Sequence, residues 1–445
     1  MNTLLLQPTD VLFFRDGRPM SGSLAGHGAA WPLPMVTDAA LHGALHRALL
    51  PGHDHTQRTG ATRAAADALS RTYGSLVTAG PFPVDPDGQW FFPRPLDLGG
   101  TALAPTLRPQ AGDWRHTSSL PSPLSHAVVN TGEVSKNVVA KAWLSAAAYR
   151  RYLDGGATSD LGLGAGEACD DADFSDAEAT IGIGIDPNTR AQDGDRFYSA
   201  RYLRLRDRWR MGLLAKTAEK KESDRTERED LIAKLFQRPG HIVAGGQQRV
   251  CSARIESANS PLRLPSGLSS GFGSQHLVKW VLLSPAIWPR MEEQPDRNIP
   301  PHSGGWLPNW VRETDGKVML LSGERQSRSY HGKHARGFSS STEICAHLVA
   351  ALVPKSIVIT GWALPHEAAA RPDGGAKPTQ LAVPAGAVYY FKCTTAEEAG
   401  KLAAALNWNG SESNPTTIRN RRSTLLGEKG FGLGVCGTWQ FHPSY

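Results

Sequence analysis

Hydrophobic residues recur along the chain in short runs, most of them with the two-residue period of a β-strand. The first run, TLLLQPTDVLFF, predicts one strand, a turn and the start of a second strand. Residues 36–50 have the spacing of an amphipathic helix instead, because Leu41, Leu45 and Leu49 fall on one face. A strand followed by such a helix is a usual start of an α+β unit.

The middle of the chain adds a helix and two strands. Residues 142–153 predict a helix, and residues 181–190, IGIGIDPNTR, predict a strand that ends in a Pro-Asn turn. Between residues 203 and 211 every second position is an arginine, which predicts one strand face covered by guanidinium groups: Arg204, Arg206, Arg208 and Arg210. This row either follows phosphates or faces solvent, and the pattern favours neither.

The second half contains four further strand patterns, a capped helix at residues 394–407 and a closing strand from residue 434. Strands with few helices, and without regular alternation of the two, predict an α+β fold of antiparallel sheets. A length of 445 residues suggests two domains. We divide them as residues 1–240, which carry acidic and charged insertions, and residues 241–445, which carry a glycine-rich loop.

The net charge of +6 leans modestly towards an anionic partner. Its distribution is uneven, because residues 154–195 hold eleven acidic side chains and one arginine, whereas residues 196–254 hold fifteen basic and seven acidic ones. Two such segments suit a subunit that holds nucleic acid on one side and a protein on another. Solvated loops are the simpler interpretation.

The five cysteines are far apart in sequence and form no CxxC pair, so neither a disulfide framework nor a zinc knuckle is predicted. A reducing, cytoplasmic location is the natural expectation. No basic residues precede the first apolar run, which polar residues interrupt. The N-terminus therefore predicts a strand, not a signal peptide. No stretch approaches the length of a membrane span, and no membrane partner is expected.

Residues 427–437, GEKGFGLGVCG, form the most glycine-rich segment. A dinucleotide fingerprint follows a strand and opens a helix, whereas here the predicted order is helix, loop, strand. A Walker A motif is also missing, so no nucleotide cofactor is expected. The residues alone leave a plain tight turn and a contact with a polynucleotide equally open.

No motif predicts a catalytic or metal site. GLSSG at residues 267–271 follows two prolines and lacks the strand of a nucleophile elbow. His42 and His46 have helical zinc spacing, but Gly43 stands where a zincin has its glutamate. The cluster at residues 53–55, HDH, has no partner group in sequence and is only a weak metal candidate.

Two basic segments suit single-stranded RNA by composition. Residues 323–341 combine cations with Tyr330 and Phe338, although long Gly/Ser loops are often without a ligand. The segment around the glycine-rich loop adds further cations: Arg419, Arg421, Arg422 and Lys429.

In this order, several segments resemble the third subunit of the type III-B CRISPR Cmr effector complex, a member of the RAMP superfamily. They are TDVLFFRDGRPM, TDAALHGALHRAL, FFPRPLDL, IGIGIDPNT with FYSARYLRL, GGQQR, LLSPAIW, GWLP, AVPAGAVYYF and GEKGFGLGVCGTW. The resemblance spans almost the whole chain. It departs at Gln247 and Gln248, where relatives commonly carry a charged residue.

The resemblance implies two ferredoxin-like, RRM-related domains and a non-catalytic subunit without cofactors. Such a subunit binds the 5′ repeat-derived tag of the guide RNA and bridges the large polymerase-like subunit to the backbone RAMP subunits, with target RNA met only indirectly. The residues expected to contact RNA are Lys429, Gly430, Phe431, Gly432, Gly434, Arg421 and Arg422, followed by Arg15, Arg18 and Arg249. Phe431 is expected either at a base or in the core.

Two alternatives from other classes stay open. The first is a metal-independent RAMP endoribonuclease that processes precursor guide RNA, with His27 and His42 as the nearest acid–base candidates. The second is a protein-only scaffold that touches RNA little.

Overall fold

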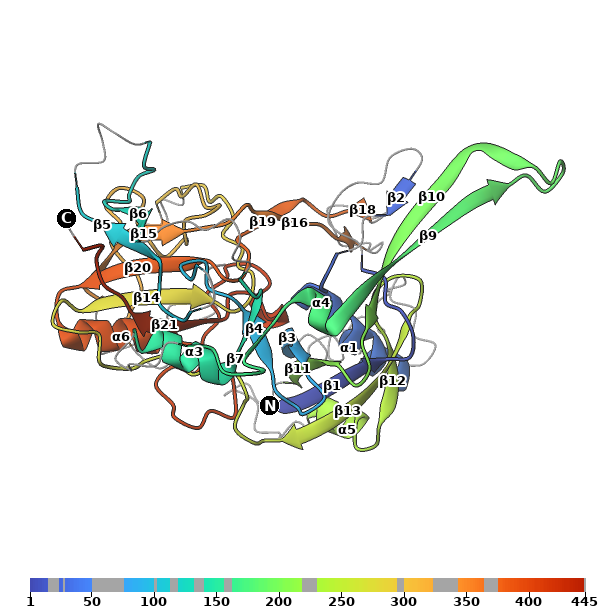
Figure 1. The fold of residues 1–445 in the computed structure, drawn as a ribbon, viewed down its shortest axis with the longest axis horizontal. Coiled ribbons are helices and arrows are strands. Elements are labelled where there is room, and N and C mark those ends of the chain that lie inside the picture. Colours follow the sequence, from blue (N-terminus) through green and yellow to red (C-terminus); the bar gives the residue numbers. More distant parts are fainter. Residues whose placement is uncertain are drawn as a thin grey trace, which may run out of the picture.

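The computed structural model of the chain describes residues 1–14, 24–26, 29–49, 76–99, 102–112, 119–131, 140–155, 162–217, 230–293, 300–322, 343–363 and 375–443. Two main sheets lie side by side, and a long hairpin projects from one end (Figure 1). Among the described strand pairs all but one are antiparallel, which confirms the predicted α+β class with antiparallel sheets.

The first main sheet has the strand order β12-β13-β1-β11-β3. Its bounds are β12 Gly240–Val243, β13 Val250–Ala258, β1 Asn2–Pro8, β11 Arg210–Lys216 and β3 Val77–Val84. Helix α1 (Pro34–Leu49) contacts β3 and β12, and the short helix α5 (Leu231–Leu235) contacts α1 and β11.

Strand β1 is buried on both faces. Leu4 and Leu6 belong to the core under α1, whereas Leu5 points to the other side and joins the core shared with the second sheet. This explains why the segment is a continuous apolar run without the alternation of a half-exposed strand.

The second main sheet has the order β15-β20-β14-β21. Its bounds are β15 Ala346–Leu352, β20 Val388–Cys393, β14 Leu277–Leu282 and β21 Gly434–Thr438. Helix α6 (Ala396–Leu406) packs on one face, and the Trp280 indole of β14 donates a hydrogen bond to the Leu406 carbonyl over 3.1 Å. Thr395 caps α6 by accepting from the Glu398 amide, as the capped-helix pattern predicted.

The opposite face of this second sheet carries helix α3 (Ala146–Leu153). The helix begins four residues later than predicted, because Trp143–Ser145 form strand β7 and the Ser145 hydroxyl then caps the helix by accepting from the Ala148 amide over 3.2 Å. Small strands complete this region: β4 Phe91–Pro93, β8 Ala168–Cys169, β5 Leu107–Gln110 and β6 Ala127–Asn130.

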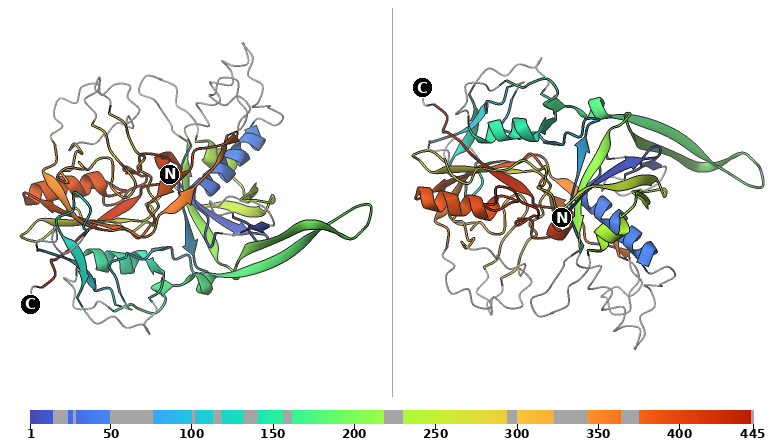
Figure 2. Two further views of the ribbon diagram at one scale, coloured as in Figure 1. Left: turned by 90° about the horizontal axis from the view of Figure 1, so that it is seen from above. Right: turned by 90° about the horizontal axis from the view of Figure 1, so that it is seen from below.

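A hairpin of β9 (Ser175–Ile185) and β10 (Gln192–Leu205) extends beyond the body in every view (Figures 1 and 2). It follows the four-residue helix α4 (Asp171–Phe174), and β2 (Leu24–Gly26) joins β10 in the one parallel pair among the described strands. Two short ribbons complete the described strands: β16 Ile357–Ile359 with β19 Gln380–Ala382, and β17 Trp362–Ala363 with β18 Gly375–Ala376.

The pairing and packing of several elements cross the domain division predicted at residue 240. Strands β12 and β13 belong to the first sheet, although most of their residues follow the division predicted at residue 240. Conversely, α3 lies against the second sheet although it precedes that division. The division into domains of residues 1–240 and 241–445 stays a prediction.

Candidate nucleic-acid interface

The glycine-rich loop lies at the joint between the two main sheets. Its first residues form the 3-10 turn η3 (Gly427–Lys429), which contacts both β3 and α1. Gly430 has a φ of 91°, and a Cβ there would come within 2.9 Å of the Ala79 Cα. Gly432 has a φ of 75°, and a Cβ there would collide with the Ser423 amide. In this conformation both glycines allow close approach of protein backbone.

Phe431 lies between these two glycines and is fully buried. It packs with Ile287, Ile359 and Ala382, and with partly buried side chains that include Leu33, which precedes α1. Of the two positions expected for this ring, the structure shows the core. A ring without exposed surface has no face on which a base can stack.

Lys429 crosses the joint to helix α1. Its Nζ lies 3.4 Å from the Asp38 Oδ2, and the other Asp38 oxygen accepts from the Thr78 hydroxyl over 3.3 Å. Burial raises the pKa of the Asp38 carboxyl above its ordinary value, and Lys429 opposes this rise. Lys429 is 34% exposed and forms this ion pair across the joint, and its predicted contact with RNA stays a prediction.

Arg422 lies against the C-terminal end of α6. Its Nε donates to the Ala405 carbonyl over 2.6 Å, where a cation complements the helix dipole. Burial lowers the pKa of Arg422 to about 10. Arg422 thus holds this segment against α6. As RNA contacts, Arg422 and the half-buried Arg421 beside it stay predictions.

Arg249 lies at the base of the hairpin, away from the glycine-rich loop. Its guanidinium carbon lies 5.0 Å from the centre of the Tyr202 ring, and its Nη1 lies 3.5 Å from the Asp10 Oδ2. Arg15 and Arg18 lie outside the described residues. Those predicted RNA contacts that the structure describes thus divide between the joint and the hairpin base.

The predicted row of four arginines on one strand face is wrong. Strand β10 ends at Leu205, a turn follows in which Arg208 has a φ of 58°, and β11 begins at Arg210. Arg204 pairs with Glu178 and Asp10, and Arg206 with Asp176.

These pairs also join the acidic and basic segments of the sequence. The acidic strand β9 runs antiparallel to the basic strand β10, with Asp176 opposite Arg204 and Glu178 opposite Tyr202. Along this part of the hairpin the opposite charges compensate each other and do not form the two separate patches that the sequence suggested.

The hairpin carries the most exposed apolar row among the described residues. Ile181, Ile183 and Ile185 are 70%, 50% and 62% exposed. The strand register places Arg201, opposite Ala179, on the same face as Ile181. The sequence predicted the strand, but its exposure was missed, although glycines alternate with these isoleucines and supply no opposing polar face.

The model of a family described as CRISPR-associated protein (Cas_Cmr3) matches residues 4–439, which is nearly the whole chain. The chain belongs to the Cas_Cmr3 family. No curated protein matches it.

Two solved structures contain chains similar to this Cas_Cmr3 family member. One is the cryo-EM structure of the Type III-B Cmr-beta bound to cognate target RNA, with 13% identity, a TM-score of 0.38, and coverage of 87% of this chain and 86% of that chain. The other is the crystal structure of the Csm3-Csm4 subcomplex in the type III-A CRISPR-Cas interference complex, with 10% identity, a TM-score of 0.34, and coverage of 89% and 94%.

Other candidates from the sequence have the following positions in this Cas_Cmr3 family member. His42 is an exposed residue of α1, whereas His27 and residues 53–55 lie outside the described part of the chain, as do residues 323–341. Within the described part, no cluster of three or more His, Cys, Asp or Glu side chains could hold a metal ion. Nor does any helix described there reach the length and apolarity needed to span a membrane.

Proposed function

We propose that this chain is a non-catalytic, RNA-binding subunit of a type III-B CRISPR ribonucleoprotein. In this role it binds the 5′ repeat-derived tag of the guide RNA and bridges the large polymerase-like subunit to the backbone RAMP subunits. The observation that carries the proposal is the match of the Cas_Cmr3 family model to residues 4–439.

The strand orders support two ferredoxin-like domains. In the second sheet, β14, β15, β20 and β21 are the first to fourth strands in sequence and lie in the spatial order 4-1-3-2, with α6 between the third and fourth. In the first sheet, β1, β3, β11 and β13 give the same order, with α1 after the first strand and α5 after the third.

These orders suggest a change to the domain limits. Because β13 supplies the fourth strand of the first domain, we place the division after Ala258 and not at residue 240. Residues 85–205, which include α3 and the hairpin, are then an insertion between the second and third strands of the first domain.

We assign the principal RNA contact to the projecting hairpin. Its isoleucine row offers apolar contact to bases, while Arg190 at the tip and Arg201 beside the row are exposed cations that can meet phosphates. Arg249 at the hairpin base and Arg421 near the joint are secondary candidates, because each is partly buried.

The test measures binding of a tag-sequence RNA by the full chain, alone and in the reconstituted complex, over a range of salt concentrations. The double variant Arg190→Gln/Arg201→Gln is expected to lower the slope of log affinity against log salt by about 1.4, since each single-strand phosphate contact contributes about 0.7. Arg208→Gln, an exposed arginine in the turn after the hairpin, is the matched control and should leave the slope unchanged. An unchanged slope in the double variant contradicts the hairpin assignment.

A cleavage assay separates the proposal from the endoribonuclease alternative. Repeat RNA incubated with the full chain in the absence of metal is expected to remain intact. Specific cleavage that is lost in His42→Ala would overturn the non-catalytic role. Absence of salt-dependent RNA binding in both the chain and the complex would favour the protein-only scaffold.

A further inference from the structure

A small hollow, partly open to solvent, lies on the face of the second sheet that α6 does not cover. Lys279 of β14 and Tyr390 of β20 are cross-strand partners, and α3 together with residues 94–110 lies over them. Because Trp280 points to α6, its neighbour Lys279 points to the opposite face.

A compensated charge pair forms the buried side of the hollow. Lys279 and Asp97 are 0% and 1% exposed, and the Lys279 Nζ lies 3.2 Å from the Asp97 Oδ2. The other Asp97 oxygen accepts from the Tyr152 hydroxyl over 2.6 Å, and the Lys279 Nζ lies 3.5 Å from the centre of the Tyr152 ring. Both oxygens of the carboxylate are therefore engaged, which a buried charge requires.

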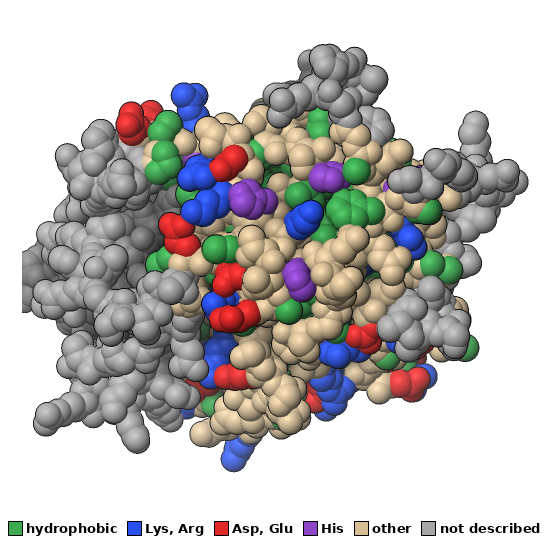
Figure 3. Space-filling model, turned by 90° about the vertical axis from the view of Figure 1, so that its left-hand side faces the viewer, with side chains coloured by type: hydrophobic (Ala, Val, Ile, Leu, Met, Phe, Trp, Pro, Cys, Tyr) green, Lys and Arg blue, Asp and Glu red, His purple; other side chains and the backbone are tan. Residues whose placement is uncertain are grey.

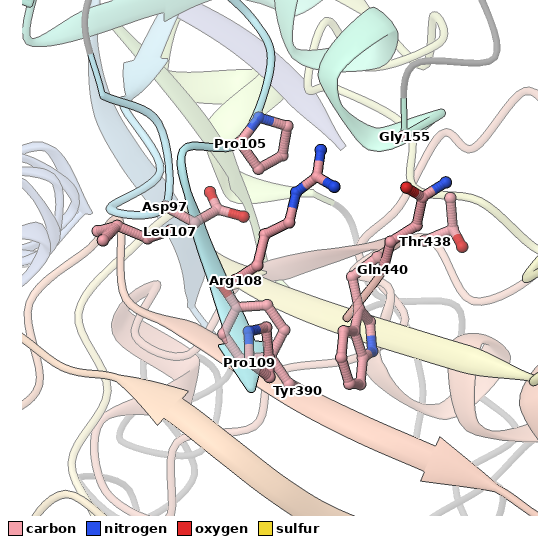
Figure 4. A pocket seen from close by; sticks show the side chains of 10 residues that line it. Asp97, Pro105, Leu107, Arg108, Pro109, Gly155, Tyr390, Thr438 and Gln440 are labelled. Carbon is pink, nitrogen blue, oxygen red and sulfur yellow. The ribbon is translucent and has the colours of Figure 1, made fainter. Parts of the chain in front are cut away.

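Arg108 is a second cation near this single carboxylate. It lies on β5 and its guanidinium stands between Asp97 on one side and Thr438 and Gln440 on the other (Figure 4). No hydrogen bond or ion pair holds this guanidinium within the described structure, although it is half-buried. Burial, and to a smaller extent the Arg108 charge, lowers the pKa of Lys279, while Asp97 opposes this change.

Tyr390 supplies a buried donor in the same hollow. It is 1% exposed, and its hydroxyl lies beside the Asp97 carboxylate without meeting full hydrogen-bond geometry. Burial, followed by the charge of Asp97 and its interaction with the hydroxyl, raises the pKa of Tyr390 well above its ordinary value, so that the hydroxyl keeps its proton. A buried hydroxyl without a well-formed hydrogen bond carries a free-energy cost that a ligand oxygen would reduce.

We propose that this hollow binds a phosphate group through Arg108, Tyr390 and Gln440. The guanidinium offers a two-pronged donor, and the hydroxyl and the exposed amide of Gln440 add two more donors at the same opening. Four donors suit the oxygens of a phosphate better than the two oxygens of a carboxylate. Pro105, Pro109 and Trp439 form apolar walls that fit a nucleoside attached to that phosphate.

The charges on the surface of the C-terminal half favour a local binding site and not a general basic patch. On this face acidic and basic side chains are interspersed among the coloured residues (Figure 3). A phosphate would thus be held by the specific donors of the hollow and not by a broad positive field. The site is independent of the proposed tag contact on the hairpin.

The test is calorimetric titration of the full chain with inorganic phosphate, with AMP, and with a single-stranded oligoribonucleotide that lacks terminal phosphates. Arg108→Gln is expected to weaken phosphate and AMP binding at least about tenfold, because a charge-assisted hydrogen-bond pair is lost. Arg290→Gln, an exposed arginine of the same half, is the control and should change affinity less than about twofold.

Tyr390→Phe separates a ligand-binding role from a structural one. Without ligand its melting temperature should equal or exceed that of the wild type, because a buried hydroxyl without a well-formed hydrogen bond is removed. Its phosphate affinity should fall by about three- to tenfold. A lower melting temperature with unchanged phosphate affinity would overturn the proposed role of this hydroxyl.

Competition between AMP and the oligoribonucleotide identifies the source of the phosphate. Displacement of AMP by the oligoribonucleotide indicates a strand phosphate, and its failure to displace AMP indicates a free nucleotide; both outcomes support the site. The proposal is wrong if phosphate and AMP do not bind, or if Arg108→Gln binds them like the wild type. It is also wrong if only an acidic peptide binds in an Arg108-dependent manner, which would make the hollow a protein-docking site.

Discussion

The segments GFGLG at residues 430–434 and IGIGI at residues 181–185 have the same alternation of glycine with large apolar residues. In the first, Phe431 and Leu433 are fully buried, whereas Ile181, Ile183 and Ile185 of the second are at least half exposed. The backbone differs as well, because Gly430 and Gly432 have positive φ values and the second segment is a regular strand.

The difference shows that local pattern alone does not determine burial. Phe431 meets residues from three separate parts of the chain, namely Leu33, Ile287 and the β16–β19 ribbon. The hairpin isoleucines extend beyond both sheets, where the described chain supplies nothing to cover them. This exposed apolar row is the surface that we propose as a contact for another molecule.

Phe431→Ala is expected to have the largest effect on stability. Truncation of this fully buried ring should lower the free energy of unfolding by about 3–5 kcal/mol, because transfer energy is lost and a cavity remains. Urea denaturation followed by tryptophan fluorescence measures this change. Ile183→Ala is the matched control from the other segment and should cost less than about 1 kcal/mol; equal losses would contradict the contrast between joint and hairpin.

Lys429→Met tests the ion pair across the joint. The stability should fall by about 0.5–1 kcal/mol at pH 7, a small value because Lys429 is one-third exposed. The pKa of Asp38 is higher in the folded state than in the unfolded state, so the folded protein holds this proton more tightly. Asp38 therefore lowers the stability as pH rises from its unfolded-state pKa through its folded-state pKa.

Loss of Lys429 raises this pKa further. The stability difference between wild type and variant is therefore full above the higher folded-state pKa, that of the variant. It closes as pH falls below the folded-state pKa of the wild type, where Asp38 is protonated in both proteins. Unfolding measured from pH 7 downwards checks this. The variant Lys429→Met/Asp38→Asn should show a difference from Asp38→Asn that does not change with pH.

The triple variant Ile181→Thr/Ile183→Thr/Ile185→Thr is expected to have the smallest effect on stability. Threonine keeps the β-branched shape of the strand, and each exposed position should change the free energy of unfolding by at most about 0.5 kcal/mol. Affinity for the tag RNA should fall, as measured in the same binding assay. A strongly destabilised variant would mean that the row is part of the core and not a contact surface.

Several elements could be predicted because their determinants are local. Helix α6 has a threonine cap and an apolar stripe, and strand β9 ends in a Pro-Asn turn, so neither depends on distant residues. The start of α3 was placed too early because Trp143–Ser145 pair with strands β4 and β8, which a local pattern does not contain.

The candidate site was less accessible to prediction. The four alternating arginines indicated one strand face, but the turn around Arg208 interrupts it and acidic residues of β9 pair with Arg204 and Arg206. The hollow at Arg108 was not predicted, since its residues lie on β5, β20 and the segment after β21. Only the folded chain brings these segments together.

The sequence by itself determined the α+β class with antiparallel sheets, the main strands and helices, and, through motifs in a fixed order, the family. These properties depend on periodicity, caps, turns and residue order, which are all written locally along the chain. The tertiary structure decided that GEKGFGLG joins the two sheets while IGIGI projects from them. It did so because burial depends on which distant surfaces meet, and Phe431 meets them whereas Ile183 does not.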